Sequence, residues 1–312
     1  MPRTAPRTTP MRCLRRIAEL RECLAEWRRR ELRVALVPTM GNLHRGHLAL
    51  LRRARREAER ALATIFVNPI QFGPGEDYAE YPRTPERDLE LLREHGADAV
   101  FLPQTEELFP HGTEGHTQVR APELDGILCG ASRPGHFAGV ATIVAKLFGL
   151  TRPDVAVFGL KDYQQLLVIR RMAADLALGA RIVAEPTARE ADGLALSSRN
   201  AYLSPPERAA APALYRTLER LAGRVRDGAR GLQALEERAR EELAAAGFRP
   251  EYVSVRDART LAPPADPAPA RGPQRLVALA AARLGKARLI DCLPFERQGA
   301  PPDGSPGQQP VK

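Results

Sequence analysis

The sequence has few of the residues that identify disulfide-rich or aromatic-rich proteins. It contains 4 cysteines in 312 residues, at positions 13, 23, 129 and 292, and no two of them form a CxxC pair. Cysteines scattered in this way are expected to be reduced thiols, which excludes a small disulfide-stabilised fold and favours a cytoplasmic protein. Aromatic residues make up 5% of the chain and are not interleaved with its arginines. The net charge of +9 therefore does not resemble a nucleic-acid surface, and we expect no nucleic-acid partner.

Several other signals are also missing. No apolar run approaches the roughly 20 residues of a membrane span, and the N-terminal residues lack the apolar segment of a secretory signal, so we expect no membrane association. Neither GxGxxG nor GxxxxGK[ST] occurs, so the sequence lacks the motifs of a Rossmann dehydrogenase and of a P-loop enzyme. The chain is nevertheless 44% apolar and 27% charged, as is ordinary for a protein with a core, and its length suits two modest domains.

Short apolar segments alternate with amphipathic ones as far as residue 185. We expect strands at residues 32–37, 62–67, 97–102, 153–158 and 181–185, with a brief further strand at 117–120. Helices are expected at residues 14–27, from 48 onward, and at 84–95, 140–150 and 163–176. Alternation of this kind predicts an α/β fold with a Rossmann-like, doubly wound parallel sheet.

The pattern changes after residue 185. Two amphipathic helices, at 206–226 and 232–246, precede strand-like runs at 251–256, 275–280 and 287–292, with a Pro/Ala-rich loop at 261–273. We therefore expect a disordered extension at residues 1–10 and a Rossmann-like domain at 11–186. A smaller C-terminal α+β domain should follow at 187–294, and then a disordered Gly-, Pro- and Gln-rich tail at 295–312.

Two histidines, His44 and His47, lie where the first of these strands gives way to a helix. That corner of a parallel sheet is the usual ligand site, and the helix N-terminus attracts anions there. Imidazole N–H groups can donate to phosphate oxygens, and Gly46 leaves room for a nucleotide against the backbone. The pair could instead bind a metal, although no third ligand is evident nearby, or could be two ordinary capping or surface histidines.

The run PTMGNLHRGH at residues 38–47 resembles the signature of the pantothenate synthetases, a family within the HxGH nucleotidyltransferase superfamily. Four further blocks match that family in order. They are residues 68–72 (NPIQF), 133–137 (RPGHF) with Gly139 and Val140, 161–165 (KDYQQ), and 197–200 (SSRN) followed by Tyr202 and Leu203. The resemblance covers residues from about 11 to 292, and five blocks in order are very specific.

The resemblance implies a Rossmann-like fold of the HUP nucleotidyltransferase type and an AMP-forming ligase. ATP and pantoate would form pantoyl adenylate and pyrophosphate, and the amine of β-alanine would then attack the adenylate to give pantothenate and AMP. The implied cofactor is Mg²⁺, held mainly by the ATP phosphates with no dedicated protein metal site. The family is homodimeric and cytoplasmic, so both properties are expected here.

The same resemblance assigns roles to individual residues. Catalysis would depend on His44, His47, Lys161, Ser197, Ser198 and Arg199. ATP would also contact Pro38, Thr39, Met40, Gly41, Gly46, Gly159, Leu160, Asp162 and Leu196. Pantoate would lie against Pro38, Met40, Gln71 and Gln165, and β-alanine against Gln71, Tyr81, Arg133 and His136.

The chain departs from the family pattern at Leu196, where methionine is usual, and at Leu160, where a polar residue is common. Two other interpretations remain open. Another HxGH nucleotidyltransferase, a cytidylyl- or adenylyltransferase, would need a basic acceptor pocket in place of Gln71 and Gln165. A non-catalytic nucleotide-binding protein would be favoured if the histidines, Lys161 or Arg199 were missing, and all are present.

Overall fold

The computed structural model describes residues 10–266 and 272–298, and its contacts divide the chain into two compact units. The first contains the residues up to Glu190 together with Ala195–Ser198. The second contains Ala191–Leu194 and the residues from Arg199 onward. The disorder expected for residues 1–9 and 299–312 lies outside the described residues.

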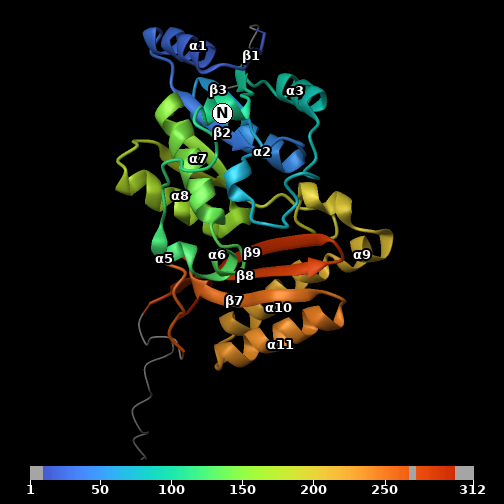
Figure 1. Ribbon diagram of the computed structural model, residues 1–312. Helices are drawn as coiled ribbons and strands as arrows, with labels where there is room; N and C mark the ends of the chain where they lie inside the picture. The colour runs from blue at the N-terminus through green and yellow to red at the C-terminus, as the bar shows by residue number, and fades with distance from the viewer. Residues whose placement is uncertain (1–9, 267–271, 299–312) are drawn as a thin grey trace, which may run out of the picture. The chain divides into compact units, whose positions relative to one another are not determined.

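A six-stranded parallel sheet forms the centre of the first unit, in the order β1-β4-β3-β2-β5-β6 (Figure 1). The strands are β1 (Arg12–Leu14), β2 (Val34–Thr39), β3 (Arg60–Ile65), β4 (Ala99–Phe101), β5 (Val155–Gly159) and β6 (Arg181–Glu185). The chain builds outward from β2 in one direction through β3 and β4, and in the other through β5 and β6. The switch point, where ligands bind in such sheets, therefore lies between β2 and β5.

Helices cover both faces of the sheet, which confirms the expected doubly wound α/β fold. The longer helices are α1 (Ile17–Arg29), α2 (Arg45–Glu57), α3 (Pro85–Glu94), α7 (His136–Thr151) and α8 (Tyr163–Asp175). Short helical turns are α4 (Thr105–Leu108), α5 (Pro122–Asp125), α6 (Leu128–Ser132), η1 (Pro69–Gln71) and η2 (Leu160–Asp162). Helices α2 and α3 lie on one face and α1, α7 and α8 on the other, as the usual right-handed crossovers require for this strand order, and α7 contacts both α1 and α8 (Figure 1).

Three expectations about the first unit are wrong. Residues 12–14, placed by us before or at the start of a helix, form the edge strand β1, which is too short to show a periodic pattern. Residues 117–120 form no strand, because the Val119 N–H donates to the side chain of Thr142 (2.9 Å). Helix α7 begins at His136 and not at residue 140, after Gly135 in the left-handed conformation (φ 82°).

The second unit is the expected smaller α+β fold, with an antiparallel sheet of β7 (Arg249–Asp257), β8 (Gln274–Leu284) and β9 (Ala287–Arg297). The helix expected at 206–226 is interrupted near Pro212, giving α9 (Pro205–Ala210) and α10 (Ala213–Arg226), followed by α11 (Leu232–Ala245). A short turn, η3 (Ser198–Tyr202), precedes them. The expected tail from residue 295 is wrong in its start, because Phe295 is buried and pairs with Leu276 in the sheet. Within the described residues, no helix is both long and apolar enough to cross a membrane.

Helix α7 approaches the segment that follows β3 closely at Gly139. A Cβ at this position would lie 2.2 Å from the carbonyl oxygen of Ile70 and 2.6 Å from the Cα of Gln71. Both are backbone atoms, which cannot rotate away as the end of a flexible side chain can. Glycine therefore lets η1 lie directly against α7, and this contact fixes the backbone that carries Gln71.

We predict that Gly139→Ala lowers the free energy of unfolding by about 1–3 kcal/mol, the usual cost of overpacking. Gly149→Ala is the matched control, because it lies in the same helix and an added Cβ there meets nothing within 4 Å. Helix propensity predicts that this control is neutral or stabilising by up to ~1 kcal/mol. Urea unfolding followed by circular dichroism measures both, and equal midpoints for the two variants would contradict the close approach.

Candidate active site

Two imidazole rings occupy the first turn of α2. His44 caps the helix, and its Nδ1 accepts the N–H of Gly46 (3.1 Å), while Nδ1 of His47 accepts the N–H of His44 (3.3 Å). The ring centroids are 4.1 Å apart. Because each Nδ1 accepts a hydrogen bond, each neutral ring carries its proton on Nε2. The two histidines are thus capping residues and also present a pair of Nε2–H donors.

The environment keeps both rings neutral. Burial, and then the positive charge of Lys161, lowers the pKa of His44 to about 4. The pKa of His47 falls to about 3, chiefly through burial and then through the charges of His44 and Lys161. At neutral pH the rings therefore act as uncharged hydrogen-bond donors, and the fixed positive charge beside them belongs to Lys161.

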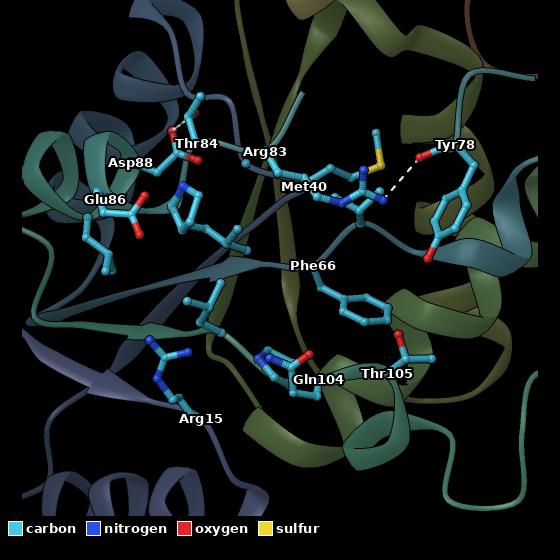
Figure 2. A pocket seen from close by; sticks show the side chains of 17 residues that line it. Arg15, Met40, Phe66, Tyr78, Arg83, Thr84, Glu86, Asp88, Gln104 and Thr105 are labelled. Atoms are coloured by element: carbon cyan, nitrogen blue, oxygen red, sulfur yellow. Dashed lines mark hydrogen bonds between the residues drawn. The ribbon is translucent and has the colours of Figure 1, made fainter. Parts of the chain in front are cut away.

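The turn between β2 and α2 is held by the carboxylate of Asp88 on α3, which is 1% exposed. Its Oδ2 accepts the N–H of Asn42 (2.8 Å), and its Oδ1 accepts the N–H of Leu43 (2.7 Å) and the hydroxyl of Thr84 (3.1 Å; Figure 2). Gly41 (φ 82°) and Asn42 (φ 49°) have left-handed backbones in this turn. A buried carboxylate therefore satisfies the amides of a turn that an ordinary sequence would not form. Sequence reasoning placed Asp88 in a helix but missed this role.

Two glycines of the motif are required by neighbouring side chains. A Cβ on Gly41 would lie 2.9 Å from Oδ2 of Asp88, and one on Gly46 would lie 2.9 Å from the ring of His44. At the end of β2, the hydroxyl of Thr39 donates to the carbonyl of Thr64 (2.7 Å) and accepts the N–H of Gly41 (3.2 Å). Pro38 precedes it in the strand. Contacts within the motif, together with those to Asp88 and Thr64, therefore fix the shape of this turn.

A cavity of about 470 Å³ lies at the carboxyl ends of β3 and β4, on the side of this turn that faces α3 (Figure 2). Phe66, Thr84, Asp88 and Gln104 are among the residues that line it. Of the residues that the sequence predicted for the site, this cavity contacts only two, Met40 and Gly41. The other residues predicted for the site do not line this cavity.

The carboxyl end of β5 supplies the cation. Lys161 and Asp162 lie in η2, and Nζ of Lys161 is 3.5 Å from Oδ2 of Asp162. The lysine side chain is 19% exposed and that of Asp162 is 39% exposed, so this pair is weak and open to a competing anion. Gly159 just before them has open space where a Cβ would be, and Leu160 follows it.

Residues 195–198 return to the first unit. The N–H of Leu196 donates to the carbonyl of Ala188 (2.9 Å), and the hydroxyl of Ser198 donates to the carbonyl of Asn42 (3.4 Å). Ser198, with Ser197 beside it in the chain, is thereby brought to the turn that carries His44. Arg199, the remaining predicted member of this block, is the residue at which the chain enters the second unit.

The carboxyl end of β3 carries a second polar group. Nε2 of Gln71 donates to Sδ of Met40 (3.0 Å), and Nδ2 of Asn68 donates to Oε1 of Gln71 (3.0 Å) and to the carbonyl of Gly139 (3.2 Å). Oδ1 of Asn68 is buried and accepts no hydrogen bond from the described residues. A buried acceptor of this kind is suited to a donor from a ligand. Sequence reasoning included Asn68 in a motif block but gave it no role.

The adjacent glutamines of α8 differ in what they do. Gln164 is buried, where its Oε1 accepts the N–H of Cys129 (3.0 Å) and its Nε2 donates to the carbonyls of Leu124 (2.7 Å) and Ile127 (2.8 Å). Its side chain is therefore committed to holding the α5–α6 segment. Gln165 is half-buried and has none of these bonds, so it is the member of the pair that a ligand can reach.

Of the other residues that we associated with the second substrate, His136 contacts Gln71 directly, whereas Tyr81 contacts Phe72 and Arg133 contacts His136. Tyr81 is buried, and its ring packs edge-on against Phe72 with centroids 6.0 Å apart. Arg133 is bonded to the carboxylate of Glu76, and His136 bridges Arg133 to the carbonyl of Gln71. The guanidinium therefore already has a carboxylate partner within the protein.

We predict that His44 and His47 stay in the neutral, Nε2-protonated form from pH 8 down to about pH 5.5. Their pKa values of about 4 and 3 lie below the ordinary 6.5, so the unfolded chain binds protons that the native chain does not. The free energy of unfolding should accordingly fall as the pH drops below 6.5. Two-bond ¹H–¹⁵N NMR of the imidazoles, assigned with His44→Gln and His47→Gln, measures the state directly, and a midpoint near pH 6.5 for either ring would refute it.

We predict that Asp88→Asn lowers the free energy of unfolding by about 1–3 kcal/mol, because the amide NH₂ leaves a backbone N–H of the turn without its acceptor. The ring signals of His44 should shift in the same variant. The control is Glu86→Gln, an exposed acidic side chain in the same turn of α3. An unchanged His44 spectrum in Asp88→Asn would show that the carboxylate does not shape the turn.

Comparison with known proteins places this geometry in a family. The family model described as Pantoate-beta-alanine ligase matches residues 12–294. The pantothenate synthetase of Thioalkalivibrio sulfidiphilus is 57% identical over 92% of this chain and 98% of its own. That of Chromohalobacter salexigens is 54% identical over 89% of this chain and 96% of its own. The crystal structure of pantothenate synthetase from Thermus thermophilus has a TM-score of 0.82 with 48% identity, and covers 91% of this chain and 99% of its own. The crystal structure of the Francisella tularensis ligase complexed with β,γ-ATP and β-alanine has a TM-score of 0.75 with 29% identity, and covers 91% of this chain and 97% of its own. The chain belongs to the pantoate–β-alanine ligase family.

Proposed function

We propose that the carboxyl edge of the six-stranded sheet is the site at which this chain condenses pantoate with β-alanine. The chain is an ATP-dependent ligase that forms pantothenate through a pantoyl-adenylate intermediate and releases AMP and pyrophosphate. One observation supports this location most strongly. His44 and His47 present two neutral Nε2–H donors beside the charge of Lys161, at the switch point of the sheet.

In the first half-reaction a pantoate carboxylate attacks the α-phosphate of ATP, and like charges repel as they approach. The residues near the phosphates must therefore reduce negative charge while the attack stays in line. His44 and His47 donate to phosphate oxygens, and these bonds strengthen as charge builds up in the transition state. Lys161 neutralises charge on the departing pyrophosphate, for which it exchanges its weak pair with Asp162. Asp162 then becomes available to the ribose hydroxyls.

ATP lies along the turn formed by residues 38–41 and against the open face of Gly159 and Leu160. Ser197 and Ser198 contribute hydroxyls to the outer phosphates, as the bond from Ser198 to the β2–α2 turn supports. Leu196 and Arg199 remain predictions from the sequence. Among residues 10–266 and 272–298, no group of three His, Cys, Asp or Glu side chains is arranged to hold a metal ion. Mg²⁺ bound with ATP would supply positive charge that offsets the charge of the leaving pyrophosphate, next to Lys161 and the hydroxyls of Ser197 and Ser198.

Pantoate carries two hydroxyls, a carboxylate and a gem-dimethyl group. Gln71 and Gln165 supply neutral donors and acceptors from different strand ends, and the buried Oδ1 of Asn68 accepts one further hydroxyl. Met40 and Pro38 supply apolar surface for the methyl groups. Neutral amides suit this acid better than they suit a phosphorylated acceptor, which would require cationic side chains.

β-Alanine follows pantoate into the space beside Gln71 and Tyr81, and its amine attacks the acyl carbon of the adenylate. AMP leaves with the electron pair of the broken acyl–oxygen bond, and the amine loses a proton. Arg133 and His136 border this space, but the guanidinium is already bonded to Glu76.

We also propose that the protein is cytoplasmic and homodimeric. The four cysteines are all free, as suits a reducing compartment. The homodimer rests on the family resemblance alone. Sedimentation equilibrium gives the mass in solution directly, and a monomer throughout the micromolar range would end this part of the proposal.

We predict that pantoate alone supports ATP–pyrophosphate exchange, and that net pyrophosphate release in turnover requires β-alanine as well. His47→Ala and Lys161→Ala should each lower the exchange rate by about 10²–10³-fold, as loss of a transition-state donor does. His111→Ala, on an exposed loop, is the control and should match the unsubstituted protein. Exchange supported by a phosphorylated acceptor, and not by pantoate, would reject the substrate while leaving the fold family intact.

A further inference from the structure

A half-buried ion pair lies beside the proposed pantoate pocket. Nε and one terminal nitrogen of Arg133 donate to the two carboxylate oxygens of Glu76, both at 2.6 Å. The side chains are 12% and 19% exposed, so solvent screens the pair little. Two parallel charge-assisted bonds of this kind fix the plane of the guanidinium as well as its position.

The sequence presents Glu76 at the end of a tight turn. Residues 73–76 read Gly-Pro-Gly-Glu, the N–H of Glu76 donates to the carbonyl of Gly73 (3.1 Å), and Gly75 has a positive φ of 76°. Proline in the second position and glycine in the third are the signature of a type II turn. The turn is therefore set locally, and it delivers a carboxylate to a guanidinium 57 residues away in the sequence.

The ion pair is connected to Gln71 through His136. The remaining terminal nitrogen of Arg133 lies 2.8 Å from Nε2 of His136, and Nδ1 of His136 lies 2.9 Å from the carbonyl oxygen of Gln71. An arginine can only donate, so Nε2 accepts and Nδ1–H donates to the carbonyl. One chain of directional bonds thus runs from Glu76 through Arg133 and His136 to the backbone of Gln71.

That backbone carries the side chain that we assign to pantoate. The side-chain amide of Gln71 is held in turn by Asn68 and Met40. The close approach of α7 at Gly139 also restrains the backbone of residues 70–71. Burial alone would raise the pKa of Glu76, but the bonds from Arg133 outweigh it, and the pKa lies below its ordinary value. The carboxylate of Glu76 is therefore charged at neutral pH.

We propose that Glu76 is a positioning residue for pantoate: through Arg133 and His136 it fixes the backbone of Gln71 in the orientation that binds the acid. This inference rests on the proposed function and assigns to Arg133 a role different from that suggested by the sequence. Arg133 binds an internal carboxylate and orients His136, and it does not hold the carboxylate of β-alanine.

The test is ATP–pyrophosphate exchange with pantoate and without β-alanine, which isolates the first half-reaction. Glu76→Gln keeps the shape of the side chain but cannot accept two charge-assisted bonds. We expect its KM for pantoate to rise by about 10- to 100-fold, the effect typical of removing a group that orients a binding residue, while its KM for ATP changes less than about twofold. Glu80→Gln, an exposed acidic side chain in the same loop, is the control and should change neither constant.

A double-substitution cycle separates coupling from general damage. If Glu76 acts through Arg133, Glu76→Gln combined with Arg133→Gln should be no worse than Arg133→Gln alone, whereas independent roles would multiply the two losses. Urea midpoints of all variants, measured in parallel, identify any that are unfolded. For an unfolded variant, Glu76→Asp replaces Glu76→Gln, and it should show a smaller rise in the same constant.

Three results would overturn the proposal. One is a pantoate KM in Glu76→Gln equal to that of Glu80→Gln. Another is equal damage to the KM values of ATP and pantoate. The third is a fall in the KM for β-alanine in full turnover, which would mean that Glu76 competes with the substrate for Arg133. Failure of the unsubstituted protein to catalyse pantoate-dependent exchange would reject the proposed function itself, so the two failures are distinguishable.

Discussion

The site depends on two hydrogen bonds in which a backbone N–H at the start of α2 is donated to an imidazole nitrogen. A helix leaves its first amides without partners, and here the rings of His44 and His47 supply acceptors for two of them. Each bond orients a ring and also fixes its proton on Nε2. The spacing of the motif follows from this geometry, since a capping box joins a helix cap to the third residue beyond it. Gly46 is needed because a side chain there would press on the ring of His44.

Neutral rings and one separate cation suit the chemistry better than two imidazolium ions would. Burying a charged imidazole is costly, and the lowered pKa values of both histidines express that cost. A neutral N–H donor contributes little to holding the ground-state anion, but its bond strengthens as charge develops on the phosphate oxygen. The ammonium of Lys161 lies at the end of a flexible side chain that remains partly exposed. In the proposed mechanism it follows the departing pyrophosphate, which the fixed rings cannot do.

The fold could be predicted from the sequence wherever the signal was local. The central strands and the helices after residues 84 and 163 have clear apolar periodicity, and the motif blocks predict a site at the carboxyl edge of the sheet. What escaped prediction depends on contacts between distant segments. Asp88 acts on a turn 45 residues before it, and Gln164 acts on a segment 35 residues before it. Strand β1 has three residues and forms only because β4 lies beside it, so no periodic pattern could reveal it.

In the block at residues 161–165, the glutamine that is fully committed to the fold is not the one that we assign to substrate. Gln164 uses both ends of its amide on backbone groups, and its neighbour Gln165 remains accessible. Asn68 donates its NH₂ to the carbonyl of Gly139, whereas its Oδ1 accepts no hydrogen bond from the described residues. The same rule decides between two roles for Arg133. A guanidinium that already makes two charge-assisted bonds to Glu76 and a third contact to His136 gains little by exchanging them for the carboxylate of a small amino acid. The half-buried charge of Glu76 would then lose its cationic partner. Position beside a substrate pocket is therefore insufficient to make a residue a ligand, and its existing bonds must be counted first.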